Sequence, residues 1–265
     1  MNASTTTKPR VAVHKFSSCD GCQLALLNLG EDLLTLAGRV DLVHFAEAGP
    51  LDPDIDVDVA FVEGSVSTPE DLERIQHIRS HSRLLIAIGA CATSGGIQSL
   101  RNGVFGEDWV TQIYSHPEAI TSLQRSTPIS SHVKVDFELW GCPVSGPQML
   151  AVVNALLLGV APRDNADKVC TECKRQGYPC VMVTHGIACM GPVTRAGCGA
   201  LCPSLGRDCY GCYGPAENAN TDALAAQFAT LGLAPEAIIQ RFQSINSQAP
   251  VFLAAAEKIR AGSDE

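Results

Sequence analysis

The segment from Cys170 to Cys212 constrains this chain most, because it holds eight cysteines, many glycines and prolines, and no hydrophobic period. Such a segment lacks the regularly spaced apolar positions from which helices and strands build a core. Bound metal would order it, since metal binding can supply folding free energy where a hydrophobic core cannot. The sequence therefore predicts a metal-dependent region in the second half of the chain.

Composition limits what the remainder can be. The chain has 265 residues, of which 46% are apolar, enough for one large domain or two modest ones with a real core. Its net charge is −9 and it has no run of Lys or Arg, so we expect no nucleic acid and no anionic membrane surface as partner.

The N-terminus and the apolar runs indicate where the protein works. The first ten residues, MNASTTTKPR, contain neither an apolar signal core nor a twin-arginine pair. The longest apolar stretch, around Leu150 to Ala161, is too short to span a bilayer. We therefore expect a cytoplasmic protein with no membrane insertion. Disulfides are rare in the cytoplasm, so metal binding explains 12 cysteines better than scattered inert thiols do.

The first part of the chain alternates strand-like and helix-like segments. A helix is predicted from Gln23 to Gly38 by leucines at helical spacing, another behind the Thr68-Pro69 cap, and an apolar one at Met149–Leu158. Alternation of this kind is typical of an open, mostly parallel α/β sheet. The strands that the pattern predicts are residues 10–16, 40–46, 57–64, 84–90 and 133–139.

Four cysteines follow predicted strands. Cys19 and Cys22 form a C-x-x-C after the first strand, Cys91 follows residues 84–90, and Cys142 follows residues 133–139. The carboxyl ends of parallel strands meet at one edge of a sheet, so we expect the four thiols to meet there and hold a [4Fe–4S] cluster. Nearby glycines would let the backbone approach it. A thioredoxin-type site would leave Cys91 and Cys142 unexplained, whereas zinc would accept the same four thiolates.

The last eight cysteines divide most simply in chain order, into Cys170, Cys173, Cys180 and Cys189, and then Cys198, Cys202, Cys209 and Cys212. Spacing alone leaves open an exchange of ligands between the two sets. It also leaves open a pair of structural zinc knots. Beyond them two helices are predicted, one capped by Thr221 and ending at Gly232, and one opened by Pro235 and including Ile245.

The cysteine motifs together resemble those of a known family. Cys19-Asp-Gly-Cys22, Glu63-Gly-Ser-Val-Ser, Gly89-Ala-Cys91-Ala-Thr-Ser-Gly-Gly and Gly141-Cys142-Pro look like the signatures of [NiFe] hydrogenase small subunits. The block from Val169 to Cys212 is similar to that of cytoplasmic NAD(P)-linked members, including the sulfhydrogenase delta type.

The resemblance implies a flavodoxin-like domain at residues 8–162 and a small irregular and helical iron–sulfur domain at residues 163–265. It assigns the ligands of the proximal cluster to Cys19, Cys22, Cys91 and Cys142, of the distal cluster to Cys170, Cys173, Cys180 and Cys189, and of the medial cluster to Cys198, Cys202, Cys209 and Cys212. Cys170 stands where membrane-bound members have histidine, and Cys202 adds a fourth medial cysteine, so three [4Fe–4S] clusters are expected.

The function that the resemblance implies is electron transfer. A large subunit would oxidise hydrogen at nickel and iron, and iron–sulfur or flavin subunits would reduce NAD(P), with flow in either direction. Close relatives serve deazaflavin- or heterodisulfide-reducing partners instead. A quinone-reductase subunit with one cluster and a zinc-stapled interaction module without redox activity are the other interpretations. The chain lacks a G-x-G-x-x-G after a strand, so we expect it to bind no nicotinamide itself.

Three further positions are candidates for site residues. We expect Glu63 to be an ordinary exposed loop carboxylate, rather than a group that moves protons or bonds a partner loop. His185 lies between Cys180 and Cys189 and could compete as a ligand, but the cysteines already complete the set, so we expect a histidine in a loop or beside the ligands. The stretch from Arg195 to Cys202 faintly resembles a nickel-ligand motif, but its spacing differs and we expect no nickel in this chain.

Overall fold

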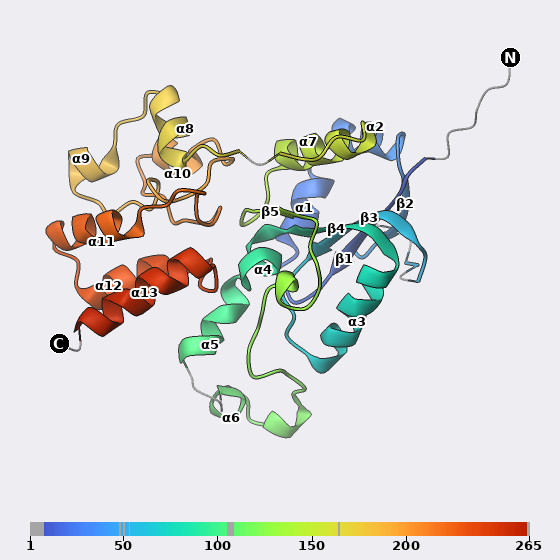
Figure 1. Ribbon diagram of the computed structural model, residues 1–265, viewed down its shortest axis with the longest axis horizontal. Helices are drawn as coiled ribbons and strands as arrows, with labels where there is room; N and C mark the ends of the chain where they lie inside the picture. Colours follow the sequence, from blue (N-terminus) through green and yellow to red (C-terminus); the bar gives the residue numbers. More distant parts are fainter. Residues whose placement is uncertain are drawn as a thin grey trace, which may run out of the picture.

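The computed structural model describes residues 8–47, 49, 51–52, 54–104, 109–163 and 165–263. Residues 1–7, which belong to the stretch inspected for a targeting signal, lie outside these ranges. In Figure 1 the chain forms a sheet-containing part and a helical part beside it, which carries the C-terminus. Among the described residues, no helix has the length and apolar character needed to cross a membrane.

A five-stranded parallel sheet forms the centre of the first part, in the order β2-β1-β3-β4-β5. This is the strand order of flavodoxin-like proteins, and it reverses between β1 and β3, where such folds place their ligand site. The α/β prediction is therefore confirmed. The strands are β1 (Arg10–Lys15), β2 (Asp41–Phe45), β3 (Val57–Glu63), β4 (Ser82–Ile88) and β5 (Phe137–Leu139).

Side chains alternate along each strand, so the sheet builds a core on both faces. Val11, Val13 and Phe61 belong to a buried cluster with α1 (Gly21–Leu27), α2 (Glu31–Ala37) and α7 (Gly146–Leu157). Ala12, Ala60 and their neighbours form a second cluster with α3 (Pro69–Ser80) and α4 (Gly89–Ser94). Figure 1 shows α2 and α7 on one side of the sheet and α3 on the other.

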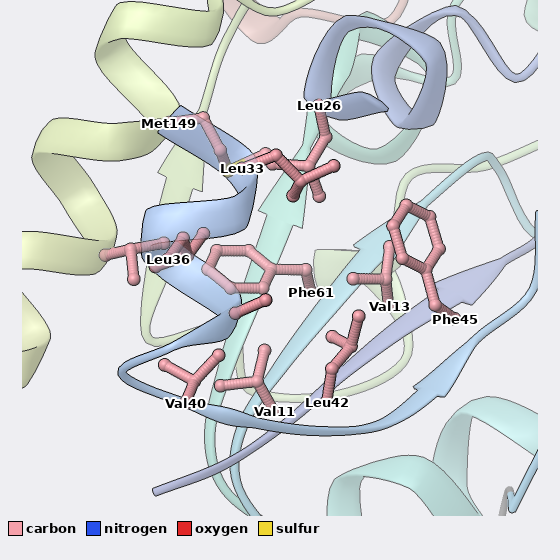
Figure 2. Close-up of a pocket in the computed structure, with 12 residues that line it drawn as sticks. Val11, Val13, Leu26, Leu33, Leu36, Val40, Leu42, Phe45, Phe61 and Met149 are labelled. Carbon is pink, nitrogen blue, oxygen red and sulfur yellow. The ribbon is translucent and has the colours of Figure 1, made fainter. Parts of the chain in front are cut away.

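A small apolar cavity remains beneath α2 (Figure 2). Its volume is about 30 Å³, and its walls carry no polar surface, so a water molecule inside would find no hydrogen-bond partner. The lining side chains come from β1, β2, β3, α1, α2 and α7, among them Val11, Val13, Leu33, Leu36, Phe61 and Met149.

Local structure differs from the sequence prediction at two places here. The single helix expected at residues 23–38 is two helices, because Gly30 adopts a φ of 60° between α1 and α2. The fifth strand begins at Phe137 rather than Val133, after a 3₁₀ turn at Ile129–Ser131. The Thr68 cap is confirmed as a capping box, in which Thr68 and Asp71 each accept a backbone N–H of the other.

Short helical segments connect the sheet to its surroundings. Between β4 and β5 the chain forms η1 (Ile97–Leu100), α5 (Arg101–Val104), α6 (Trp109–Ile113) and a 3₁₀ turn at Pro117–Ala119. The second part carries α8 (Val169–Arg175), α9 (Val181–His185), α10 (Leu201–Ser204), α11 (Thr221–Thr230), α12 (Pro235–Phe242) and α13 (Pro250–Ser263).

The C-terminal helices bury a third apolar cluster, which includes Phe228, Phe242 and Phe252. The predicted cap of α11 was one residue off: the Asn220 side chain, not that of Thr221, accepts the Ala223 N–H at 3.0 Å. Pro235 does open α12, but Ile245 lies beyond its end. Helix α13 was not predicted.

Buried hydrogen bonds join the two parts. Ser94 at the end of α4 donates to Asn246 Oδ1 at 2.7 Å, and the hydroxyls of Ser99 and Ser247 lie 2.6 Å apart. Asn246 also donates to the carbonyl of Gly211, within the cysteine-rich segment, at 2.8 Å. The second part is thus held against the edge of the sheet where β4 and β5 end.

Candidate metal centre

The first four cysteines gather at the carboxyl edge of the sheet, as their positions after strands predict. Cys19 lies between β1 and α1, Cys22 in α1, Cys91 in α4, and Cys142 just after β5. Cys91 and Cys142 each interact electrostatically with Cys19, and Cys22 interacts with both of them. All four thiols are free. The fold therefore brings four thiol groups from three loops to one place.

Glycines keep the space around these sulfurs open. A Cβ added at Gly89 would lie 2.4 Å from Cys22 Sγ, and one at Gly96 would lie 2.6 Å from Cys91 Sγ. Both glycines have positive φ, which side chains rarely adopt. A bulky inorganic group bound by these thiols needs such a close backbone approach, so the surroundings fit an iron–sulfur cluster.

Glu63 was expected to be an exposed loop carboxylate, and this was wrong. It is the last residue of β3 and only 2% exposed. Its carboxylate accepts the backbone N–H of Cys22 at 3.1 Å and that of Gln23 at 3.2 Å, in the first turn of α1. Burial raises the pKa of the Glu63 carboxyl, against these two hydrogen bonds, which lower it. Glu63 thus fixes the helix that carries Cys22.

Burial also governs the protonation of these thiols. It raises the pKa of Cys91 to about 12 and that of Cys22 above its ordinary value, with the charges of neighbouring groups adding to the effect. Without a cation at the centre, the thiols of Cys22 and Cys91 would keep their protons at neutral pH. Positively charged metal favours the thiolates, so binding would release protons.

The second set of cysteines surrounds α8 and α9. Cys170 and Cys173 lie in α8, Cys180 caps α9, and Cys189 follows it. Cys170 interacts with the other three, and burial raises its pKa to about 11. A Cβ at Gly191 would lie 3.2 Å from Cys170 Sγ and 3.5 Å from Cys189 Sγ. These four residues lie close together, and their grouping as the ligands of one cluster stays a prediction.

The third set has less uniform neighbours. Cys212 interacts with Cys198 and Cys202, and burial raises its pKa to about 12. Cys209 interacts with Cys212, but also with Cys189 of the second set. Its backbone N–H donates to Cys189 Sγ at 3.2 Å. Cys209 therefore lies where the second and third sets meet.

The third set also reaches the first. The electrostatic neighbours of Cys212 include Cys142, at the sheet edge. Trp140, two residues before Cys142, packs in the C-terminal apolar cluster, and a Cβ at Gly214 would lie 2.1 Å from its ring. The three sets thus lie in the spatial order first, third, second, which differs from their order along the chain.

Sequence reasoning missed Glu172, which lies between Cys170 and Cys173. Its carboxylate accepts the N–H of Gly197 at 2.8 Å and that of Ala200 at 3.1 Å, and lies 3.9 Å from Cys198 Sγ. Burial raises the pKa of Cys198, and the Glu172 charge adds to it, against nearby backbone N–H groups. An acidic residue inside C-x-x-C was the only sequence signal.

Two other observations concern metal binding. His185 is the last residue of α9 and its side chain is exposed, so it lies at a helix end rather than in the loop expected for it. Within the described ranges, no group of three His, Cys, Asp or Glu side chains is arranged to hold a single metal ion.

Comparison with known proteins decides the family. Residues 19–156, just over half of the chain, match the family described as NADH ubiquinone oxidoreductase, 20 Kd subunit. The chain belongs to this family. The match begins at Cys19 and ends within α7, so it includes the loops that carry the first four cysteines.

Two relatives extend the likeness into the second part. The chain is 35% identical to the delta subunit of sulfhydrogenase 2 from Pyrococcus furiosus, over 81% of this chain and 90% of that protein. It is 34% identical to a vhu subunit of the F420-non-reducing hydrogenase from Methanocaldococcus jannaschii, over 79% and 83%. The resemblance to hydrogenase small subunits, identified from the cysteine motifs, is thereby confirmed.

A solved structure shows the same fold. A chain of an NAD+-reducing [NiFe]-hydrogenase in the H2-reduced state is 29% identical, with a TM-score of 0.55. The alignment covers 94% of that chain but 59% of this one. About two fifths of the present chain therefore lies outside the alignment with that chain.

Proposed function

We propose that this protein is the electron-transfer small subunit of a [NiFe] hydrogenase, relaying electrons from hydrogen oxidation at a large subunit through three [4Fe–4S] clusters to an NAD(P)-reducing partner, in either direction. The observation that carries this proposal is the gathering of 12 free thiols into three neighbouring sets. The active site itself would lie on the large subunit, and this chain would work in the cytoplasm.

The residues of this chain would hold and separate the clusters. Cys19, Cys22, Cys91 and Cys142 would bind the one nearest the large subunit, at the sheet edge. When bound, clusters supply one-electron storage, with potentials set by nearby hydrogen bonds, charge and burial. The division at residues 8–162 and 163–265 would then separate the hydrogen-side site from the two sites that lead to the electron acceptor.

The spatial order of the three sets supports a relay. Cys212 of the third set neighbours Cys142 of the first, and the Cys209 N–H reaches Cys189 of the second at 3.2 Å. Electrons entering at the sheet edge would meet the set of Cys198 before that of Cys170. The resemblance implies the same order, with the cluster of Cys170, Cys173, Cys180 and Cys189 farthest from the large subunit.

The identity of the acceptor has a second candidate. The relatives that match about four fifths of this chain include a subunit of an F420-non-reducing hydrogenase, whereas the chain of the NAD+-reducing enzyme lacks about two fifths of it. A partner that reduces a heterodisulfide or another non-nicotinamide acceptor is therefore the alternative. Assaying hydrogen-dependent reduction of NAD, NADP and a disulfide by the purified complex separates the two.

Two cysteine substitutions test the relay itself. Cys142→Ser removes a ligand on the hydrogen side, so hydrogen should no longer reduce any cluster in this chain. Cys173→Ser removes a ligand of the farthest set, so hydrogen should still reduce the first cluster while reduction of the physiological acceptor stops. Each variant serves as the control of the other. Unchanged acceptor reduction in Cys173→Ser would contradict the proposed route.

A zinc-stapled interaction module is the alternative from another class. It would give a colourless protein with zinc and no acid-labile sulfide. The proposed clusters give visible absorbance and stoichiometric sulfide, so the same preparation distinguishes the two.

A further inference from the structure

Glu172 lies between two cysteines of the second set but reaches the third set with its carboxylate. Its Oε1 atom accepts the N–H of Gly197 at 2.8 Å, and its Oε2 atom accepts that of Ala200 at 3.1 Å. These two residues lie on either side of Cys198, whose Sγ atom lies 3.9 Å from Oε2. One side chain therefore connects α8 to the loop that carries Cys198.

The loop that Glu172 holds is conformationally demanding. Ala200 adopts a φ of 54°, in the left-handed region that residues with a Cβ seldom occupy. Gly197 has a φ of 137°, and a Cβ there would lie 2.2 Å from Gln148 Nε2. Because the carboxylate receives N–H groups on both sides of Cys198, it stabilises the conformation that directs the thiol.

The charge on Glu172 has no cationic partner within the described part of the chain. Arg175, in the last turn of the same helix, pairs instead with Asp167 at 2.5 Å. The two hydrogen bonds that its carboxylate accepts come from backbone N–H groups on either side of Cys198. A negative charge at Glu172, whose Oε2 atom lies 3.9 Å from Cys198 Sγ, would disfavour an added electron on a cluster bound by Cys198, since the interior screens charges far less than water does.

We propose that Glu172 positions Cys198 and holds down the reduction potential of the cluster bound by Cys198, Cys202, Cys209 and Cys212. This rests on the proposed function, because it presumes that a cluster is bound there. The carboxylate would make this middle site harder to reduce than its thiolates alone would. Glu172 also belongs to the C-x-x-C of the neighbouring site, so both sites share one structural support.

The test is a redox titration followed by electron paramagnetic resonance, on the full chain in its complex. Glu172→Gln removes the charge and keeps one carbonyl acceptor, whereas Glu172→Asp keeps the charge and withdraws it by one methylene. The potential of the middle cluster should rise in the order wild type, Glu172→Asp, Glu172→Gln. A tenfold change in the reduction equilibrium corresponds to about 59 mV for one electron, and Glu172→Gln should shift it at least this far.

The matched control is Glu257→Gln, which makes the same charge change at an exposed position of α13. It should leave all three potentials unchanged. If Glu172→Gln does not retain its iron, Glu172→Asp provides the test. The potential of its middle cluster must then lie above that of the wild type. The inference would be overturned if the middle-cluster potential of the Glu172 variants equalled that of the wild type. Equal shifts in Glu172→Gln and Glu257→Gln would also overturn it. Absence of the middle cluster from the wild type would instead remove the proposed function.

Discussion

The carboxylate of Glu63, at the carboxyl end of β3, accepts the backbone N–H of Cys22 at 3.1 Å. Since β3 neighbours β1 in the sheet, this bond joins a central strand to the helix that carries Cys22. The ligand geometry at the sheet edge thus depends on a buried acid that is not itself a ligand candidate.

Glu63→Ala should destabilise the protein. The substitution leaves the N–H groups of Cys22 and Gln23 without an acceptor, at a cost of about 1–3 kcal/mol for each buried group. Thermal unfolding of the anaerobic protein should show a drop in Tm of about 2–4 °C per kcal/mol. Glu73→Ala, at an exposed position in α3, is the control and should change Tm little. Equal Tm values for the two variants would contradict the role of Glu63.

Gly89→Ala should abolish the first site while sparing the others. The new Cβ would lie 2.4 Å from Cys22 Sγ, at a φ of +83° that alanine seldom adopts. Iron analysis should therefore show a loss of about four irons per chain. Gly103→Ala, where a Cβ meets nothing within 4 Å, is the matched control and should keep the full iron content. Full iron content in Gly89→Ala would contradict the assignment of a cluster to the thiols beside Gly89.

The sequence placed the cysteines of the sheet edge together but did not predict the residues that support them, for a physical reason. Parallel strands deliver their following loops to one edge, so Cys19, Cys91 and Cys142 could be placed together from strand positions alone. Glu63 and Glu172 act on backbone N–H groups far away in sequence, and no spacing rule encodes such contacts. The two helices that meet at residue 30 were predicted as one, because leucines keep a helical period on both sides of the glycine.

Two buried histidines should make stability depend on pH. Burial lowers the pKa of His14 to about 3, with His44, Arg74 and His77 adding to the effect, and burial also lowers the pKa of His44. The unfolded chain protonates His14 near pH 6.5 and the folded chain does not, so stability falls as pH drops from 6.5 toward 3. The slope should approach about 1.4 kcal/mol per pH unit for His14.

Unfolding by urea between about pH 7.5 and about pH 5.5 measures this slope, which begins near the ordinary histidine pKa. His14 stacks on His44 with ring centroids 4.5 Å apart, and His14→Phe keeps a ring in this place. The variant should lose the part of the slope that comes from the one proton bound by His14 in the unfolded chain. The exposed His116 provides the control, and His116→Phe should leave the slope as in the wild type. An unchanged slope in His14→Phe would show that His14 does not stay neutral on folding.

The cavity beneath α2 should accept one more methyl group. Val13→Ile adds a methylene beside a space of about 30 Å³, and burying it should stabilise the fold by up to about 0.8 kcal/mol. Val62→Ile is the matched control, since Val62 is fully buried on the other face of the sheet and does not line this cavity. Overpacking there should cost about 1–3 kcal/mol. Destabilisation by both variants, measured by urea unfolding, would mean that the cavity is not available.

We propose that the 12 cysteines bind three four-iron clusters as thiolates. The decisive measurement is the number of iron atoms and acid-labile sulfides per chain, after anaerobic purification free of partner subunits. We predict about 12 irons and about 12 sulfides, with paramagnetic signals appearing on reduction by dithionite. Folded, colourless protein that holds zinc, or no more than about four irons per chain, would show that the 12 cysteines do not hold three clusters.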